Sequence, residues 1–534
     1  MSLINKYYLL LFSKYMKHLK AFFISLLVFG GVTFSFAQKS KEEKASRPNI
    51  VFIMSDDHAY QAISAYGQGL NHTPYIDSLA QQGILFNRAF VNNSLCAPSR
   101  ASIISGKYSG NSTVKEIGDI FDGSQTTFPK ELQNAWYQTA LVGKWHLYSP
   151  PTGFDYWNIL PGQGDYYQPD FIKMGDTVQV NGYVTNLITD DAIDWLEQRD
   201  TTKPFSVLIW HKAPHRNWMP ELKYLNKFDE EMIPEPETLF DDYTTRTRAA
   251  REQEMEIGQW LSPNYDLKTD LRPDGSANYD GTWKAIFNRL TEAEQKAYEE
   301  AYGPKNKSFK KANLKGKELV RWKYQRYMKD YLRTVQTIDD NVGRVMDYLK
   351  ENGLEENTIV IYTSDQGFYM GEHGWFDKRF MYEESFRTPL IMRWPEKIKP
   401  GIVSDAPVMN LDIGETLLDA AGVKIPEDME GESFLPILED KKPKDWRKYV
   451  YYQYYANDSH NVAKHIGVRS DRYKLIYFFQ NNDWELYDLE KDPTEINNVY
   501  GQSEYKEVQN ELFKVLKEKA SKNDPDVEVK NNGL

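Results

Sequence analysis

Asn93-Ser-Leu-Cys-Ala-Pro-Ser-Arg-Ala-Ser-Ile-Ile-Ser-Gly106 is the stretch around which we expect the chain to be organised, because it holds Cys96, the only cysteine of the 534 residues. Pro98 suits the first turn of a helix, where its missing N–H removes no hydrogen bond, and Gly106 suits the position just past a helix end. The stretch therefore predicts a helix over residues 97–105 with Cys96 at or near its N-terminus. Free N–H groups and the helix dipole favour an anion at that position.

A cation is expected beside the sulfur atom. Arg100 lies four positions after Cys96, so both side chains project from one face of the predicted helix. A lone cysteine is more often a buried, inert thiol. In an exported protein, however, a single cysteine cannot form an internal disulfide, which leaves Cys96 without a structural role. The helix start and the arginine spacing therefore favour a functional residue.

The first 37 residues are typical of a secretory signal peptide. Three lysines between positions 14 and 20 precede an apolar run over residues 21–34, and residues 35–37 offer a small-residue cleavage site. We expect residues 38–47 to form a flexible leader and the mature protein to be secreted, either to the periplasm or to the cell exterior. The apolar run is short for a membrane span and no other run resembles it, so we predict no stable membrane insertion.

The composition indicates a folded, acidic protein. Hydrophobic residues make up 41% of the chain and aromatic residues 14%, which excludes a disordered chain. The length suggests two domains, one of them large. The formal net charge of −12 would repel polyanions at long range, so we expect no nucleic-acid partner.

Four apolar runs, each followed by polar side chains, predict the core of the fold: Asn49 to Met54, Thr139 to Val142, Phe205 to Trp210 and Thr358 to Tyr362. Continuous apolar runs are typical of strands that are buried on both faces of a parallel sheet. Helical patterns lie between them, including apolar residues at steps of three and four over residues 324–349. The sequence thus predicts an α/β fold with a mostly parallel central sheet between helices, with ligands bound beyond the carboxyl ends of the strands.

The domain boundaries are read from changes in this pattern. We expect a large catalytic domain over residues 48–400, with a charged, proline-containing helical insertion over residues 220–320. Residues 401–534 contain short aromatic runs separated by turn residues, and then a final helical pattern over residues 504–520. This order predicts a smaller C-terminal α+β subdomain with an antiparallel sheet and a packed helix.

Two of the strand ends carry a set of oxygen ligands. Asp56 and Asp57 follow the first run, and Asp365 and Gln366 follow the fourth. Carboxylate and amide oxygens suit Ca²⁺, suit Mg²⁺ less readily and suit zinc poorly. Adjacent acids alone are mostly a solvated turn, but a second acid at an equivalent strand end favours a metal site.

The other two strand ends carry basic side chains. Lys144 and His146 lie two positions apart after the second run and would point the same way if the backbone stayed extended. His211 and His215 follow the third run, and either imidazole could protonate a leaving group near neutral pH. Each of these residues alone is also compatible with an exposed turn.

Together, these motifs resemble the type I sulfatases, which depend on formylglycine and belong to the alkaline-phosphatase superfamily. Cys96-Ala-Pro-Ser-Arg100 resembles the Cys-x-Pro-Ser-Arg core of that family, and residues 485–495 resemble its closing C-terminal motif. The resemblance runs from about residue 47 to residue 499. It implies an alkaline-phosphatase-like fold, one Ca²⁺ ion, and a maturation enzyme that converts Cys96 to formylglycine (3-oxoalanine).

The resemblance also implies roles for the site residues. Asp56, Asp57, Asp365 and Gln366, together with modified Cys96, would bind calcium, although Gln366 stands where many relatives carry asparagine. The hydrated aldehyde would attack sulfur, and His215, in the Ala-Pro-His triplet, would protonate the sugar oxygen. The remaining catalytic roles fall to Arg100, Lys144 and Lys378 around the sulfate and to His146 beside the nucleophile. His211, Arg216 and His373 are candidates for substrate contact.

The implied function is hydrolysis of a sulfate ester on a sulfated carbohydrate. Residues 162–170 and the Ala-Pro-His-Arg segment resemble the N-acetylglucosamine-6-sulfatase-like branch of bacterial polysaccharide sulfatases. An algal sulfated glycan such as ulvan is a close alternative. Two further alternatives are a formylglycine-dependent phosphonate or phosphodiester hydrolase and a catalytically silent carbohydrate-binding relative.

Overall fold

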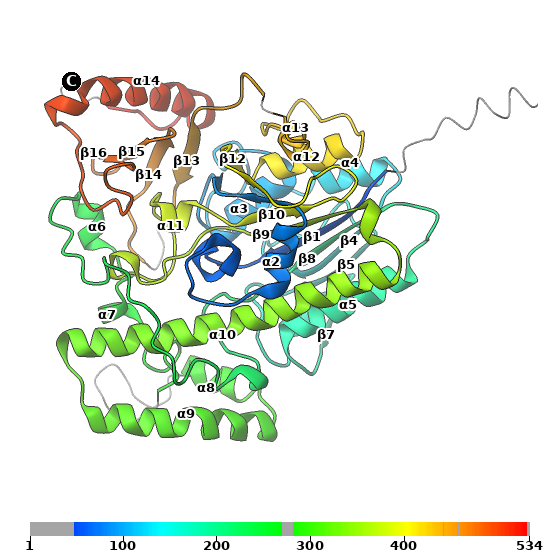
Figure 1. Ribbon diagram of the computed structural model, residues 1–534, viewed down its shortest axis with the longest axis horizontal. Coiled ribbons are helices and arrows are strands. Elements are labelled where there is room, and N and C mark those ends of the chain that lie inside the picture. Colours follow the sequence, from blue (N-terminus) through cyan, green and yellow to red (C-terminus); the bar gives the residue numbers. More distant parts are fainter. Residues whose placement is uncertain (1–46, 270–280, 442, 457–459, 531–534) are drawn as a thin grey trace, which may run out of the picture. The chain divides into compact units, whose positions relative to one another are not determined.

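A ten-stranded sheet lies at the centre of the protein (Figure 1). The structure is a computed structural model that describes residues 47–269, 281–441, 443–456 and 460–530. The predicted signal peptide and all of the predicted leader except Arg47 lie outside the described residues. Residues from Pro48 onward belong to one compact unit.

The four predicted strands are neighbours at the middle of this sheet. They are β1 (Asn49–Ser55), β4 (Gln138–Lys144), β8 (Phe205–Trp210) and β9 (Thr358–Ser364), and they lie parallel in the order β9-β1-β8-β4. Their carboxyl ends therefore meet at one edge of the sheet, as the sequence predicts. The outer strands are β11 (Ile402–Ser404), β2 (Ile84–Phe86) and β10 (Leu390–Arg393) on one side, and β5 (Tyr156–Leu160), β6 (Asp170–Lys173) and β7 (Asp176–Gln179) on the other.

Both faces of the sheet are covered, which explains why these strands are apolar throughout. Alternate residues of β1 enter two different cores: Ile50, Phe52 and Met54 pack on one side, and Val51 and Ile53 on the other. The first core includes α3 (Cys96–Ser105), α4 (Phe128–Asn134) and α12 (Asp412–Ala420). The second includes α2 (Pro74–Gln81), α5 (Val184–Gln198) and α10 (Gly316–Glu351).

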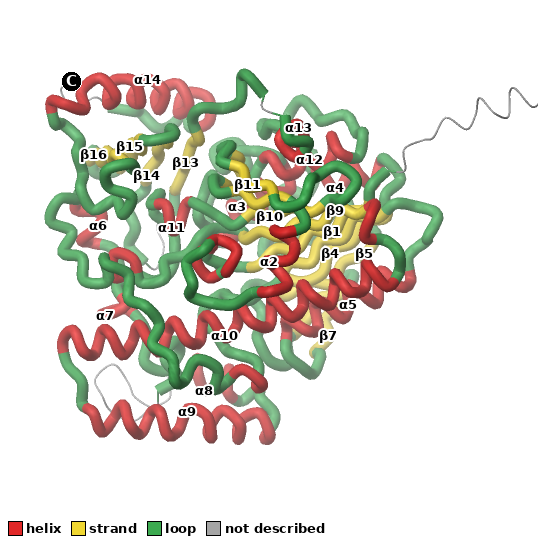
Figure 2. The backbone as a smooth tube through the Cα atoms, in the orientation of Figure 1, coloured by secondary structure: helices red, strands yellow, loops and turns green. Residues whose placement is uncertain are grey.

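The helix α10 contains the apolar pattern predicted over residues 324–349, and residues with that spacing are buried along its length. The segment before it holds α6 (Arg248–Glu252), α7 (Ile257–Trp260), α8 (Gly281–Phe287) and α9 (Glu292–Ala312). The described part of residues 220–320 contains helices and loops but no strand, as predicted for a helical insertion (Figure 2).

A second sheet lies in the C-terminal part of the chain. It is antiparallel, in the order β13 (Val450–Tyr454), β14 (His465–Arg469), β15 (Tyr473–Phe478) and β16 (Asp483–Asp488), and α14 (Lys506–Asn523) packs on β14 and β15. The predicted antiparallel sheet and packed helix are confirmed. The segment directly after residue 400 still joins the large body, because β11 pairs with β2, and β12 (Val408–Met409) pairs with β3 (Ala89–Phe90). The boundary at residue 400 stays a prediction.

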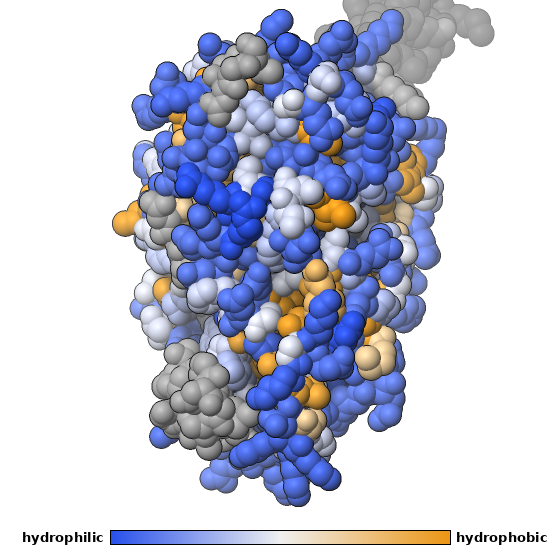
Figure 3. Space-filling view, turned by 90° about the vertical axis from the view of Figure 1, so that its left-hand side faces the viewer, coloured by the Kyte–Doolittle hydropathy of each residue, from blue (hydrophilic) through white to orange (hydrophobic). Residues whose placement is uncertain are grey.

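Within the described residues, no helix is both long enough and apolar enough to cross a membrane. The face shown in Figure 3 is mostly hydrophilic, with hydrophobic residues gathered only in small patches.

Candidate functional site

Three acids meet at the carboxyl ends of β1 and β9. The two strands pair through Ser55 and Ser364, so the residues that follow them, Asp56 and Asp365, lie side by side. One carboxylate oxygen from each of Asp56, Asp57 and Asp365 lies within 4.8 Å of the others, and all three side chains are fully buried. The structure therefore brings together the three predicted carboxylate ligands.

The donor set fits a hard cation. Burial, and then the neighbouring Asp56 carboxylate, raise the pKa of Asp365 to about 8, because three like charges in one buried place repel one another. Two buried oxygens, Asp56 Oδ1 and Gln366 Oε1, have no hydrogen-bond partner within the protein. Unpartnered buried acceptors are costly, and a cation that prefers oxygen ligands would satisfy both. The predicted ligand set, including Gln366, thus suits Ca²⁺ on its chemistry.

Each acid also faces a basic side chain. Lys144 Nζ contacts Asp56 Oδ2, and Lys378 Nζ donates to Asp57 Oδ2 at 2.7 Å. Arg100 donates to Asp365 Oδ2 from Nε at 3.0 Å and from Nη2 at 2.9 Å. Segments far apart in the sequence therefore place three cations around the acids, and these are the cations that the sequence predicted.

The nucleophile candidate, Cys96, is the first residue of α3, and Gly106 ends this helix in the left-handed conformation. The predicted helix is confirmed. Burial, and then the Asp56 carboxylate, raise the pKa of the Cys96 thiol above its usual value, in opposition to the helix start, which favours an anion. Arg100 cannot offset this because it pairs with Asp365. Gln366 Nε2 lies 3.9 Å from Cys96 Sγ. The raised pKa disfavours the thiolate form of an unmodified Cys96.

The backbone that leads from β4 to His146 does not stay extended. The strand ends at Lys144, and His146 has a φ of 57°, in the left-handed region, so the condition under which the two side chains would point the same way is not met. The tight turn brings the imidazole back against Tyr148, whose hydroxyl lies 3.2 Å from Nε2. Nδ1 is buried and has no hydrogen-bond partner. Burial, and then Lys144, lower the pKa of His146.

His215 lies on the opposite side of the acids. Its Nε2 is 3.7 Å from Asp57 Oδ2, and a ring nitrogen lies within 4.8 Å of both Cys96 Sγ and an Asp56 oxygen. Its Nδ1 is 2.7 Å from the Arg216 carbonyl oxygen. The ring therefore stands beside the nucleophile candidate, as the sequence predicted for a proton donor.

The three predicted substrate residues have other partners. His211 is buried after β8 and its backbone N–H donates to Met54 O at 2.8 Å; burial lowers its pKa to about 3. Arg216 forms an ion pair with Asp266. His373 contacts Asp241 and Arg246 through Nδ1, at 3.2 Å and 2.8 Å. Substrate contact by these three residues stays a prediction.

Two further residues lie at the site. Lys144 Nζ donates to Gln163 Oε1 at 2.5 Å. Lys212 Nζ lies 4.9 Å from the centre of the Tyr166 ring, and burial, followed by the charge of Lys144, lowers its pKa to about 8. Both residues lie in segments singled out from the sequence, residues 162–170 and the third strand end, but neither was named as a site residue.

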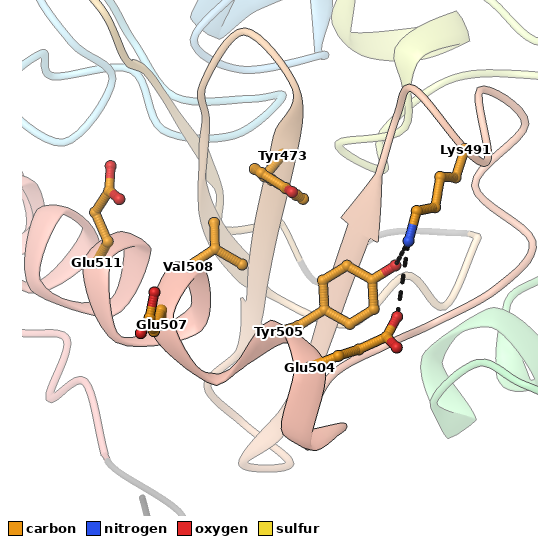
Figure 4. Close-up of a pocket in the computed structure, with 7 residues that line it drawn as sticks. All are labelled: Tyr473, Lys491, Glu504, Tyr505, Glu507, Val508 and Glu511. Carbon is orange, nitrogen blue, oxygen red and sulfur yellow. Dashed lines mark hydrogen bonds and ion pairs between the residues drawn. The ribbon is translucent and has the colours of Figure 1, made fainter.

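A separate hollow of about 500 Å³ lies on the C-terminal part of the chain (Figure 4). Its lining includes Glu504, Glu507 and Glu511 from the last helical segment, with Lys491 paired to Glu504 at 3.7 Å. Three carboxylates and one paired lysine would repel a sulfated sugar. The buried group around Cys96 is therefore the better candidate for sulfate chemistry.

Comparisons with known proteins agree with this site. Residues 48–423 match the family described as Sulfatase, and residues 371–522 match the family described as N-sulphoglucosamine sulphohydrolase, C-terminal. The chain is 47% identical over 511 residues to an N-acetylglucosamine-6-O-sulfatase of Bacteroides thetaiotaomicron, which covers 94% of this chain and 92% of the relative. An ulvan-active sulfatase of Formosa agariphila is 26% identical, over 90% of this chain and 82% of its own.

A solved structure extends the agreement to the fold. It is a complex of a protein with its substrate D-glucosamine-2-N,6-O-disulfate, and it matches with a TM-score of 0.87 and 48% identity. The match covers 90% of this chain and 98% of the solved one. With a cysteine at the start of a buried helix, three acids at neighbouring strand ends and a family match over most of its length, this chain belongs to the sulfatase family and is a sulfuric ester hydrolase.

Proposed function

We propose that this sulfatase removes the 6-O-sulfate from a glucosamine or N-acetylglucosamine residue of a sulfated glycan. The observation that carries the proposal is the 47% identity, over nearly the whole chain, to a relative named as an N-acetylglucosamine-6-O-sulfatase. The solved relative at 48% identity, whose substrate is a 6-O-sulfated glucosamine, supports the same class.

In this proposal Asp56, Asp57, Asp365 and Gln366 hold the metal with modified Cys96. A bound Ca²⁺ would neutralise charge on the sulfate oxygens, and formylglycine at position 96 would supply the nucleophile. Side chains of the protein would supply the remaining positive charge. Arg100, Lys144 and Lys378 surround the same point with positive charge, and their contacts with the three acids hold them in place before substrate arrives.

Proton transfer is assigned to the two histidines. His215 stands within reach of the nucleophile position, so its Nε2 is placed to give a proton to the departing sugar oxygen. His146 has a buried Nδ1 with no hydrogen-bond partner and is placed to support the nucleophile as a base. An alkoxide is a poor leaving group, so the proton from His215 matters most for a sugar sulfate.

Sulfated algal glycans are a weaker candidate substrate, supported by the ulvan-active relative at 26% identity. A solved phosphonate monoester hydrolase is 20% identical to this chain, a likeness that supports a shared fold and not a shared substrate. A catalytically silent binding protein would not need three basic side chains around a buried acid cluster, because buried charges are costly to keep.

The test is a panel of substrates given to the protein produced with a maturation enzyme. Glucosamine-2-N,6-O-disulfate and N-acetylglucosamine-6-sulfate should release sulfate, while the 3-sulfated isomer, ulvan oligosaccharides and a phosphonate monoester should not. Cys96→Ala, produced in the same way, is the control for contaminating activity. Turnover of ulvan fragments alone, or of the phosphonate alone, would overturn the proposed substrate.

Export belongs to the same proposal. A sulfatase of polymer fragments would meet its substrate in the periplasm or outside the cell, and the signal-like residues 1–37 support that location. Fractionation of the producing cells, with detection of the chain by antibody, tests it.

A further inference from the structure

Side chains of the helical insertion form hydrogen bonds with the loop that carries His215. Arg216, the next residue, forms two hydrogen bonds with Asp266: Nε to Oδ1 at 2.6 Å and Nη2 to Oδ2 at 2.7 Å. Asp266 is fully buried, and the backbone N–H of Ser262 also donates to it, at 2.7 Å. A bidentate pair of this kind fixes the plane of the guanidinium as well as its position.

A second contact holds the backbone on the other side of Arg216. Lys268 Nζ donates to the Asn217 carbonyl oxygen at 3.0 Å and to the Asp266 carbonyl oxygen at 3.2 Å. The same ammonium donates to Asp330 Oδ2, in α10, at 2.9 Å. Lys268 therefore ties the loop and the insertion to the long helix that packs on the central sheet.

These contacts hold the Arg216 side chain and the Asn217 carbonyl, and the Arg216 carbonyl group lies between them in the chain. His215 Nδ1 lies 2.7 Å from this oxygen, and a carbonyl can only accept a hydrogen bond, so Nδ1 carries a proton. Nε2 is then the ring nitrogen that the carbonyl leaves free, and Nε2 is the atom that faces Asp57 Oδ2 at 3.7 Å. The carbonyl fixes both the tautomer and the direction of the ring.

We propose that Asp266 and Lys268 are positioning residues for His215: by clamping Arg216 and Asn217, they hold the carbonyl that orients the imidazole for proton transfer to the leaving oxygen. The inference rests on the proposed function, in which His215 is the proton donor. It assigns the helical insertion a role in catalysis, although neither residue needs to touch the substrate. Arg216 is then part of the clamp rather than of the sugar pocket.

The decisive experiment compares Asp266→Asn with Asp229→Asn on two substrates. Asp229 is the matched control: it lies in the same insertion and pairs with Arg333 and Lys305, at 2.6 Å and 2.8 Å. One substrate is N-acetylglucosamine-6-sulfate, whose alkoxide needs protonation; the other is an aryl sulfate, whose phenolate leaves with little help.

For Asp266→Asn we expect kcat on the sugar sulfate to fall about 30- to 100-fold, because general acid catalysis contributes on the order of 10² to 10⁴. KM for the sugar sulfate should change by less than about threefold, since a displaced proton donor reduces transition-state stabilisation rather than substrate binding. Turnover of the aryl sulfate should also fall by less than about threefold. Asp229→Asn should match wild type on both substrates. Equal losses on both substrates, or no loss on either, would overturn the inference.

A second variant guards against a loss that comes only from poor folding of the first. A crystal structure of the first variant makes the test independent of the substrate chosen. Lys268→Met should reproduce the selective loss in milder form. A crystal structure of Asp266→Asn should show the His215 ring turned away from the Arg216 carbonyl; an unmoved ring would contradict the inference. If matured wild type hydrolyses the aryl sulfate but no sulfated glucosamine, the proposed substrate fails, and the ring position in the variant still decides whether the clamp orients His215.

Discussion

At the scale of single residues, the site is a cluster of buried and paired charges to which the proposed cation would add. Asp56, Asp57 and Asp365 bring three carboxylates within 4.8 Å, and each is met by one lysine or arginine. Asp56 Oδ1 and Gln366 Oε1 are nevertheless left without hydrogen bonds. The protein part of the site is therefore built to accept one more positive charge.

If the site holds the proposed Ca²⁺, removal of the ion should destabilise the enzyme as well as inactivate it. Without the ion, the buried carboxylates repel one another, and a ligand present at 100 times its Kd contributes about 2.7 kcal/mol to the folded state. We expect EGTA to lower the Tm by several degrees and added Ca²⁺ to restore it, as followed by differential scanning fluorimetry. In Asp56→Asn the Tm should no longer respond to Ca²⁺; an unchanged response would contradict the assigned ligand set.

Lys212 should lower the stability of the fold at pH 7 and raise the activity. Burial lowers its pKa from 10.5 to about 8, so the unfolded chain binds more protons between these pH values and stability rises with pH across that window. Lys212→Met removes the buried ammonium and should stabilise the protein at pH 7 by on the order of 1–3 kcal/mol. This gain should shrink as the pH approaches 10.

The same substitution should lower kcat/KM for a sulfated sugar by about tenfold or more, because it removes a cation next to Lys144 and Tyr166. Urea unfolding at pH 7 and pH 10, together with sulfate-release kinetics, measures both effects. Equal stability of the two proteins at both pH values would show that the ammonium is not buried in solution.

The residues proposed for catalysis and metal binding could be chosen from the sequence because most of them occupy a fixed place in a short motif at a strand end. The packing of Lys212, Gln163 and Asp266 could not, since it depends on which loops meet in space. The raised pKa of Cys96 could not be predicted either, because burial is a property of the folded environment and outweighs the helix start and the nearby arginine.

At the scale of helices and strands, the close pairing of β4 with β8 sets the position of Lys144. Gly143, just before it, has a φ of 110°, and a Cβ at this position would lie 2.0 Å from the Trp210 carbonyl oxygen of β8. Only glycine allows the two strands to approach in this way. The need for glycine at position 143 could not be predicted from the sequence, where Gly143 simply follows an apolar run.

Gly143→Ala should therefore push β4 away from β8 and displace Lys144. We expect a loss of at least about 3 kcal/mol in the free energy of unfolding, since both backbone strain and a backbone clash contribute. Gly175→Ala is the control, because Gly175 has a φ of 106° but an added Cβ would meet nothing within 4 Å; it should cost about 1 kcal/mol. Equal losses in urea unfolding would rule out the clash as the cause.

The strands and helices were predictable where apolar spacing was strong. The run Phe205 to Trp210 coincides with β8, and the apolar steps over residues 324–349 fall within α10. The turn at His146 was not predictable, because a left-handed φ at a histidine is imposed by the surrounding packing and leaves no mark in the hydrophobic pattern.

At the scale of the whole molecule, the C-terminal sheet supports the active centre. The Tyr452 hydroxyl, on β13, accepts a hydrogen bond from the Ser94 backbone N–H at 3.1 Å and donates one to the Arg379 carbonyl oxygen. Ser94 lies two residues before Cys96, and Arg379 directly follows Lys378. One tyrosine thus links the segment that carries Cys96 to the segment that carries Lys378.

Tyr452→Phe should lower kcat and stability together. Two buried backbone groups lose their partner, which costs roughly 1–3 kcal/mol, and the freed segments should reduce kcat about five- to tenfold. Tyr477→Phe, in the same sheet, removes a hydroxyl that bonds Asn482 at 3.1 Å and should leave kcat unchanged. Steady-state kinetics and urea unfolding compare the two variants. A similar kcat in both would contradict the claim that the C-terminal sheet supports the site through Tyr452.

The burial of Cys96 sets an order of events during biosynthesis. Every residue of α3 is buried, so once this helix is packed no enzyme can reach the sulfur. If Cys96 is converted to formylglycine as proposed, the oxidation must then occur before the helix packs, and maturation becomes a race between a modifying enzyme and the folding of the chain. A chain that has folded as the thiol should remain a thiol when the maturation enzyme is added, whereas a peptide of residues 90–106 should be converted; mass spectrometry of both would show whether folding closes the opportunity.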